Sequence, residues 1–179
     1  MIYNLKNDFL SVAVSSLGAE IQSVNCCGKE YMWDGKEFWQ KHSPLLFPIC
    51  GSITSPYTYR GKEYFMEKHG FISDLDFKAV SVSDTELTLV AVENEKTLSA
   101  YPFKFEFTAK YTIDGKKLIS KYTVKNTSDE VMPYMLGLHA LCRKQLQFEP
   151  CSRQYLPRRR HEFQRLHGYG FRRRFGYLR

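Results

Sequence analysis

Residues 103–113 show the clearest alternation of apolar and polar side chains in this 179-residue chain. Phe, Phe, Phe, Ala, Tyr and Ile take every second position, and Lys, Glu, Thr, Lys and Thr lie between them. Side chains of a strand point alternately to opposite faces, so the pattern predicts a strand with one buried and one wet face. Asp114-Gly115 follows, a favoured tight-turn pair, and residues 117–125 are predicted to pair back as the next strand.

The same period recurs along the chain, and no segment carries a sustained helical stripe of apolar residues. It predicts an all-β fold, and consecutive strands with short turns favour a sandwich. Such domains often reach roughly 200 to 250 residues. A body that ends near His139 is therefore expected to lack part of its sandwich. The further predicted strands are 10–15, 19–24, 57–59, 63–66, 77–82 and 86–92.

The net positive charge of the chain comes from its last forty residues. The whole chain has 26 Lys and Arg against 19 Asp and Glu, a formal net charge of +7. Residues 1–139 hold 15 basic and 17 acidic residues, a net of −2, so residues 140–179 hold 11 and 2, a net of +9. The sequence therefore divides into a mildly acidic body, residues 1–139, and a basic tail, residues 140–179.

The tail has neither a strand nor a helix period, and its high charge with few aliphatic residues favours disorder. We expect an irregular, arginine-rich segment, disordered or translated out of frame. Its aromatic residues between arginines could hold nucleic acid nonspecifically, which is a minor hypothesis in the absence of any recognised fold motif.

Other features exclude several classes of protein. No apolar run approaches the ~20 residues that span a bilayer, and the N-terminal sequence lacks a signal-peptide pattern, so we expect a cytoplasmic protein without a membrane partner. The five cysteines are odd in number and lack CxxC spacing, so neither a disulfide framework nor a metal site is predicted. The sequence indicates no oligomeric state.

Histidine is the side chain best suited to proton transfer near neutral pH. Three of the five histidines lie in the body. His42 precedes an apolar segment and is either an exposed loop residue or part of a pocket mouth. His69 is followed by glycine, which lets the backbone approach a neighbour, and His139 ends an apolar strand. Each is a candidate site residue, and each is alone more often structural.

The body resembles the aldose 1-epimerase (mutarotase) family in its bacterial branch. The resemblance rests on short segments that occur in the order of that family. They are Gly18-Ala19-Glu20-Ile21-Gln22-Ser23-Val24, Tyr31-Met32-Trp33, Phe38-Trp39, Pro44-Leu45-Leu46-Phe47-Pro48-Ile49-Cys50-Gly51, Tyr59-Arg60-Gly61-Lys62-Glu63-Tyr64, His69-Gly70-Phe71, Tyr101-Pro102-Phe103-Lys104-Phe105, and Met132-Pro133-Tyr134 with Gly137-Leu138-His139.

The resemblance implies a galactose mutarotase-like β-sandwich with a sugar site on a concave sheet, and interconversion of the α and β anomers of an aldohexose. It implies no cofactor and no metal. His139 matches the general acid of the family, and His69 matches a second histidine that binds the sugar and supports developing charge. Ser52 and His42 are the further expected sugar-binding residues. An imidazole with a pKa near ~6.5 can give and regain a proton in one cycle.

The chain departs from the family pattern at three places. Ser52 and Ser73 stand where many relatives have arginines, which weakens the case for a phosphorylated sugar. The general-base glutamate of the family lies far downstream, and nothing after His139 resembles that region, since Glu149 and Glu162 lack a matching context. We therefore expect a truncated sandwich, with a frameshift near codon 139 or 140, and weak or absent activity. The alternative is a non-catalytic carbohydrate-binding protein.

Overall fold

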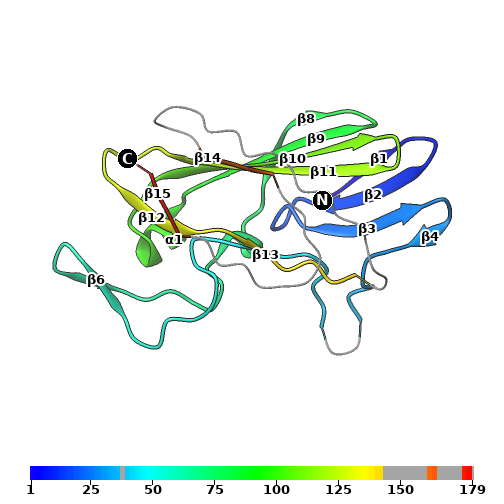
Figure 1. The fold of residues 1–179 in the computed structure, drawn as a ribbon. Coiled ribbons are helices and arrows are strands. Elements are labelled where there is room, and N and C mark those ends of the chain that lie inside the picture. The colour runs from blue at the N-terminus through cyan, green and yellow to red at the C-terminus, as the bar shows by residue number, and fades with distance from the viewer. Residues whose placement is uncertain (37–38, 143–160, 165–174, 179) are drawn as a thin grey trace.

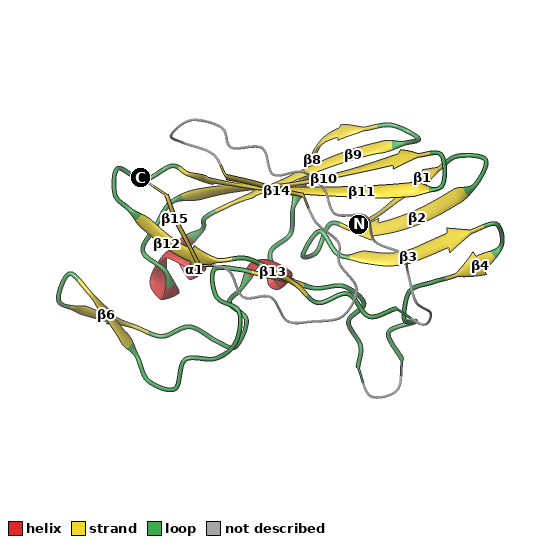
Figure 2. Ribbon diagram, viewed as in Figure 1, coloured by secondary structure: helices red, strands yellow, loops and turns green. Residues whose placement is uncertain are grey.

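The computed structural model describes residues 1–36 and 39–142, together with the backbone of residues 161–164 and 175–178. Strands dominate it, and the only helical elements in these described parts are the short 3-10 helix η1 (Ile72–Asp74) and α1 (Glu95–Ala100) (Figure 2). The predicted all-β class is therefore confirmed. No helix among the described residues is long and apolar enough to cross a membrane.

Two antiparallel sheets organise the fold (Figure 1). One has the order β1-β2-β3-β4, and the other has the order β14-β11-β10-β9-β8. The remaining strands form the pairs β12-β15, β13-β5 and β6-β7. In Figure 1, β12 and β13 lie below the five-stranded sheet, so the core is enclosed between two layers. The bounds are β1 (Ile2–Lys6), β2 (Leu10–Ser15), β3 (Ile21–Cys26), β4 (Lys29–Glu30), β5 (Leu45–Leu46), β6 (Tyr57–Tyr59), β7 (Lys62–Tyr64), β8 (Lys78–Val82), β9 (Glu86–Val92), β10 (Phe105–Asp114), β11 (Lys117–Asn126), β12 (Met132–Met135), β13 (Gly137–Leu138), β14 (His161–Gln164) and β15 (Phe175–Leu178).

The hairpin β10-β11 is the centre of the larger sheet, as its sequence predicts. Its register places Phe105 opposite Asn126 and Asp114 opposite Lys117, with the Asp-Gly turn between the strands. Every second side chain of β10, from Phe105 to Ile113, is buried. Phe103, Phe105 and Phe107 on this face have aromatic partners from the preceding chain. All three are buried, since the chain before and after the sheet folds back onto this face.

Two short strands lie within the stretch that the sequence analysis predicts as an irregular tail. β14 pairs antiparallel with β11, and β15 pairs antiparallel with β12. The edge of a sheet offers unpaired backbone groups to any extended segment, whatever the pattern of its side chains. A tail without a strand period can therefore still complete an edge. Residues 140–142 are also described, and the rest of the predicted disordered tail, including Glu149, lies outside the described residues.

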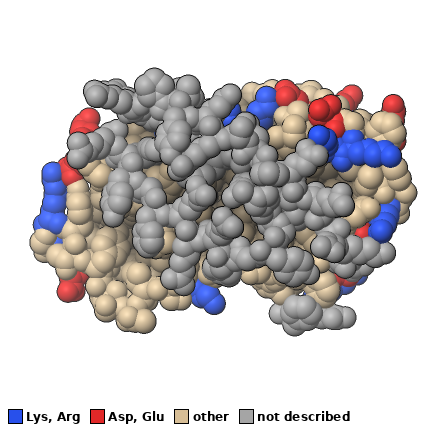
Figure 3. Space-filling model, viewed as in Figure 1, with Lys and Arg blue, Asp and Glu red and all other residues tan. Residues whose placement is uncertain are grey.

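Charged side chains are spread around the outline of the face shown in Figure 3, with basic and acidic groups mixed. This distribution fits the net charge of −2 that the sequence gives to residues 1–139. A nucleic-acid surface gathers lysines and arginines into a patch or stripe. The described residues visible on this face do not form one.

Candidate functional site

Residues 42–51 form the segment on which the site is built. β5 pairs with β13, and the same register continues outward, because His139 N–H donates to the Pro44 carbonyl at 3.1 Å and Leu141 N–H donates to the His42 carbonyl at 2.9 Å. Phe47 forms a parallel bridge with Gly70. Residues 42–51 therefore lie between the segment that carries His69 and the segment that carries His139.

His69 is held by a reciprocal pair of hydrogen bonds with Gly51. Its backbone N–H donates to the Gly51 carbonyl at 2.7 Å, and Gly51 N–H donates to His69 Nδ1 at 3.1 Å. A ring nitrogen that accepts a hydrogen bond carries no proton, so the neutral ring has its hydrogen on Nε2. His69 is thereby fixed as a donor through Nε2.

The backbone around His69 is unusual, since both His69 and Gly70 have positive φ, at 70° and 75°. Glycine adopts this region freely, and histidine does so more readily than most other residues. The two consecutive left-handed residues turn the chain so that Phe71 N–H donates to the Phe47 carbonyl at 3.0 Å. The imidazole then lies over Gly51.

Burial lowers the pKa of His69, and the charges of Lys68 and His139 lower it further. Protonation of Nδ1 would also remove the hydrogen bond from Gly51. The ring is therefore the neutral, donating form at physiological pH.

We predict that His69 titrates below 6.5, the ordinary value for histidine. Because folding lowers this pKa, the folded state binds fewer protons than the unfolded chain between the two values. The stability contributed is complete above the unfolded pKa and is lost as the pH falls through the folded pKa. NMR of the ring C–H signals checks this, with His69→Gln to assign the signal. A midpoint of 6.5 or higher would contradict the prediction.

His139 follows β13, and its ring contacts the ring of Trp39 edge to face, with centroids 4.6 Å apart and planes at 85°. Trp33 Nε1 donates to the Trp39 carbonyl at 2.8 Å and fixes the backbone of that loop. Trp39 was not predicted as a site residue, although its place beside polar residues 40–43 is a signal for an exposed aromatic wall. Aromatic rings of this kind present a flat apolar face with a polar edge.

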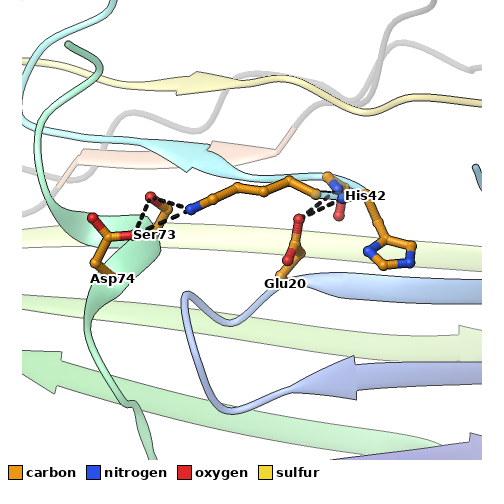
Figure 4. Close-up of polar contacts among 6 residues, drawn as sticks. Glu20, His42, Ser73 and Asp74 are labelled. Carbon is orange, nitrogen blue, oxygen red and sulfur yellow. Dashed lines mark hydrogen bonds and ion pairs between the residues drawn. The ribbon is translucent and has the colours of Figure 1, made fainter. Parts of the chain in front are cut away.

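His42 begins the 42–51 segment, and Ser52 directly follows its end. Ser52 is exposed and directly follows Gly51, so it belongs to the loop that holds His69. His42 is half-buried, and its ring packs on Gly35, where an added Cβ would lie 2.5 Å from His42 Cε1. Glu20 binds the backbone of His42 rather than its ring, accepting from the N–H groups of His42 and Ser43 at 2.7 and 2.9 Å (Figure 4).

The side chain of Lys41 reaches the 3-10 helix η1. Its Nζ donates to Ser73 Oγ at 3.0 Å and pairs with Asp74 Oδ1 at 3.1 Å. Ser73 therefore fixes Lys41 rather than offering a free hydroxyl. The cation of Lys41 is balanced by the carboxylate of Asp74.

The site so built has two imidazoles, an aromatic wall and no free carboxylate among its named contacts. Glu20 accepts two backbone N–H groups, and Asp74 holds Lys41. Within the described residues, no group of three His, Cys, Asp or Glu side chains could hold a metal ion. The geometry is suited to hydrogen bonding and proton donation to a polar, uncharged ligand.

Residues 1–143 match the family described as aldose 1-epimerase. The chain belongs to this family. The aldose 1-epimerase match covers the body and stops close to the boundary that the composition marks after His139.

Two curated proteins of Lactococcus lactis are similar to the chain. The plasmid-encoded protein LacX is 34% identical over 148 residues, and chromosomal LacX is 33% identical over the same length. Each match covers 78% of this chain and 50% of the relative. The chain thus spans about half the length of the curated relatives it matches.

Solved structures agree with this family and its fold. A galactose mutarotase related enzyme from Lactobacillus acidophilus is 39% identical with a TM-score of 0.76, covering 78% of this chain and 48% of that one. A galactose mutarotase-like protein from Lactobacillus casei is 28% identical with a TM-score of 0.78, covering 99% of this chain and 68% of that one. The predicted galactose mutarotase-like fold is confirmed.

Proposed function

We propose that the chain binds an aldohexose between His69 and His139, and that its site is built for acid/base ring opening that interconverts the α and β anomers. The observation that carries the proposal is the fixed ring of His69, which offers only Nε2–H to a ligand, on a segment that residues 42–51 join to the segment of His139. A sugar has hydroxyl groups that accept such a hydrogen bond. Trp39 supplies a wall for the apolar face of the ring.

The proposed chemistry divides between the two histidines. His139 donates a proton to the ring oxygen as the C1–O5 bond breaks. The anomeric hydroxyl must lose its proton at the same time, leaving an open-chain aldehyde. Rotation of the aldehyde and closure on its other face then give the other anomer. His69 Nε2–H hydrogen bonds a sugar oxygen and stabilises the negative charge that develops there, which is worth most in a site shielded from water.

The base is the part of this mechanism that the described residues do not supply. Glu20 and Asp74 are already engaged with the backbone and with Lys41. A positioned general base typically contributes about 10² to 10⁴ in rate. We therefore propose that this chain is impaired by a factor of that order. Non-catalytic sugar binding is the second candidate, because the donor and the aromatic wall need no base.

The proposed substrate is a neutral sugar. Ser52 offers one uncharged hydroxyl, and the positive charge of Lys41 is held by Asp74. Arginine forks bind phosphate oxygens in pairs, and the hydroxyl of Ser52 cannot do so. Binding of glucose or galactose is expected to equal or exceed binding of a hexose phosphate.

Polarimetry of freshly dissolved α-glucose or α-galactose tests the reaction, and titration calorimetry tests binding. We expect sugar binding with little or no rate above the spontaneous one. His69→Ala should weaken binding about two- to tenfold, since a neutral buried hydrogen bond contributes roughly 0.5 to 1.5 kcal/mol. Glu63→Ala, at an exposed position, is the control.

The outcomes separate the two candidate functions. A strong rate that His139→Ala abolishes would contradict the proposed impairment and support the role of His139 as acid. Sugar binding that depends on His69 without any rate supports the binding module. Sugar binding that is unchanged in both histidine variants would contradict the location of the site, and His42→Ala would then test the remaining histidine of the body.

A further inference from the structure

The turn between β3 and β4 carries two adjacent cysteines that the sugar site does not use. Cys26 pairs with Lys29, so the connection is a two-residue turn of Cys27 and Gly28. Both residues have positive φ, at 51° and 82°. Two-residue turns of this type favour asparagine or aspartate followed by glycine, and a cysteine at the first position carries a backbone cost.

The two thiols lie on the same side of this turn. Their Sγ atoms are 3.9 Å apart and share a hydrogen bond. Cys27 is exposed, Cys26 is half-buried, and the Cys27 backbone N–H donates to the Phe9 carbonyl at 3.0 Å. Two sulfurs at ~2.3 Å from one tetrahedral centre lie about 3.8 Å apart. The sulfurs are thus already at the spacing that a shared soft ligand requires.

The remaining described cysteines do not offer a second such pair. Cys50 is buried. Cys142, which forms an isolated β-bridge with Met32, is a single half-buried thiol. In Figure 1 the β3-β4 turn lies at the outer end of the four-stranded sheet, away from β13. A ligand on Cys26 and Cys27 would therefore leave the sugar site open.

We propose that Cys26 and Cys27 form a vicinal dithiol site for a soft, thiophilic centre that takes two sulfur ligands, such as trivalent arsenic. With an arsine oxide, two S–H groups are replaced by two As–S bonds, and the oxide oxygen leaves with both protons as water. Arsenic stays trivalent, so no oxidant or reductant is consumed. Soft sulfur ligands select soft centres over the hard ions that prefer oxygen.

Phenylarsine oxide is the probe, followed by intact-mass spectrometry and a count of free thiols. One adduct per chain should remove two free thiols, and dimercaptopropanol should reverse it while an equal concentration of mercaptoethanol does not. Cys26→Ser and Cys27→Ser should each weaken binding about 100-fold, because the second bond forms at high effective concentration only when both sulfurs are present.

Cys27→Asn keeps the turn, since asparagine adopts positive φ readily, and it shows that loss of binding is not loss of fold. Cys142→Ser and Cys50→Ser are the matched controls and should bind the probe as the parent chain does. An adduct retained at parental affinity in Cys27→Asn, or one mapped by digestion to cysteines other than 26 and 27, would overturn the proposal.

Discussion

Gly70→Ala is expected to lower the free energy of unfolding by about 3 to 5 kcal/mol, as strain at positive φ and overpacking act together. A Cβ at Gly70 would lie 2.2 Å from the Phe47 carbonyl oxygen and 2.5 Å from its carbon. Both are backbone atoms of a fully buried residue, so no flexible side chain can move away. Urea unfolding followed by circular dichroism measures the change. A domain is typically stable by only about 5 to 15 kcal/mol.

Gly61→Ala separates the collision from the backbone strain. Gly61 has nearly the same φ, 74° against 75°, and nothing lies within 4 Å of an added Cβ. The left-handed conformation alone costs an L-residue about 1 to 2 kcal/mol. We expect Gly61→Ala to lose only that amount. Equal losses in the two variants would show that the contact with Phe47 contributes nothing.

The result at Gly70 also bears on the site, because the same close approach places His69 over Gly51. The fraction of Gly70→Ala molecules that remains folded should also lose sugar binding. The histidine cannot move independently of its neighbour, since its own backbone N–H is bonded to Gly51. The proposed role of His69 therefore depends on the neighbouring glycine, Gly70.

The strands that the sequence predicts are those whose side-chain pattern is set by one buried face. β10 and β11 are the clearest case, because alternating aromatic residues and an Asp-Gly turn together determine both the strands and their register. The strands predicted at residues 57–59 and 63–66 flank a turn with a glycine at positive φ, and the structure pairs them as the β6-β7 hairpin. Local chemistry is sufficient in these hairpins.

Elements that depend on a few atoms or on distant partners were missed. α1 is six residues long and is capped by Asn94, whose side chain accepts from Thr97 N–H while Thr97 Oγ1 accepts from Asn94 N–H. Such a short helix has too few turns to show an apolar stripe. The apolar segment that ends at His139 was predicted as one strand, but β12 and β13 pair with different partners on either side of Leu136.

The site divides in the same way. His69 and His139 were chosen because they lie in segments resembling a known family, and the structure brings those segments to the two sides of residues 42–51. The bond from Gly51 to Nδ1 could not be predicted, since it depends on positive φ at a histidine. Nor could the contact of Trp39 with His139, which joins loops a hundred residues apart.

Phe47→Ala is expected to destabilise the chain by about 3 to 5 kcal/mol, the usual range for a buried phenylalanine. Phe47 has no exposed surface, and its ring lies 5.2 Å from that of Phe105 and 5.5 Å from that of Phe107. Its other ring contacts are Phe71, Tyr101 and Tyr134. Aromatic pairs of this kind add to the area that the ring buries. Thermal unfolding or urea unfolding measures the loss.

Phe65→Ala is the control, because Phe65 is 56% exposed and its loss should change stability by less than about 0.5 kcal/mol.

Phe47→Leu keeps most of the apolar volume and should cost less than Phe47→Ala, so the chain stays folded enough for sugar titration. The ring of Phe47 packs on the large sheet. Its backbone carbonyl accepts a hydrogen bond from Phe71 N–H. If the ring of Phe47 is what holds both histidines in place against the sheet, Phe47→Leu will weaken sugar binding. The loss of binding will then be larger than the unfolded fraction of the variant accounts for. Unchanged binding would show that the hydrogen-bonded ladder around residues 42–51 positions them without the core.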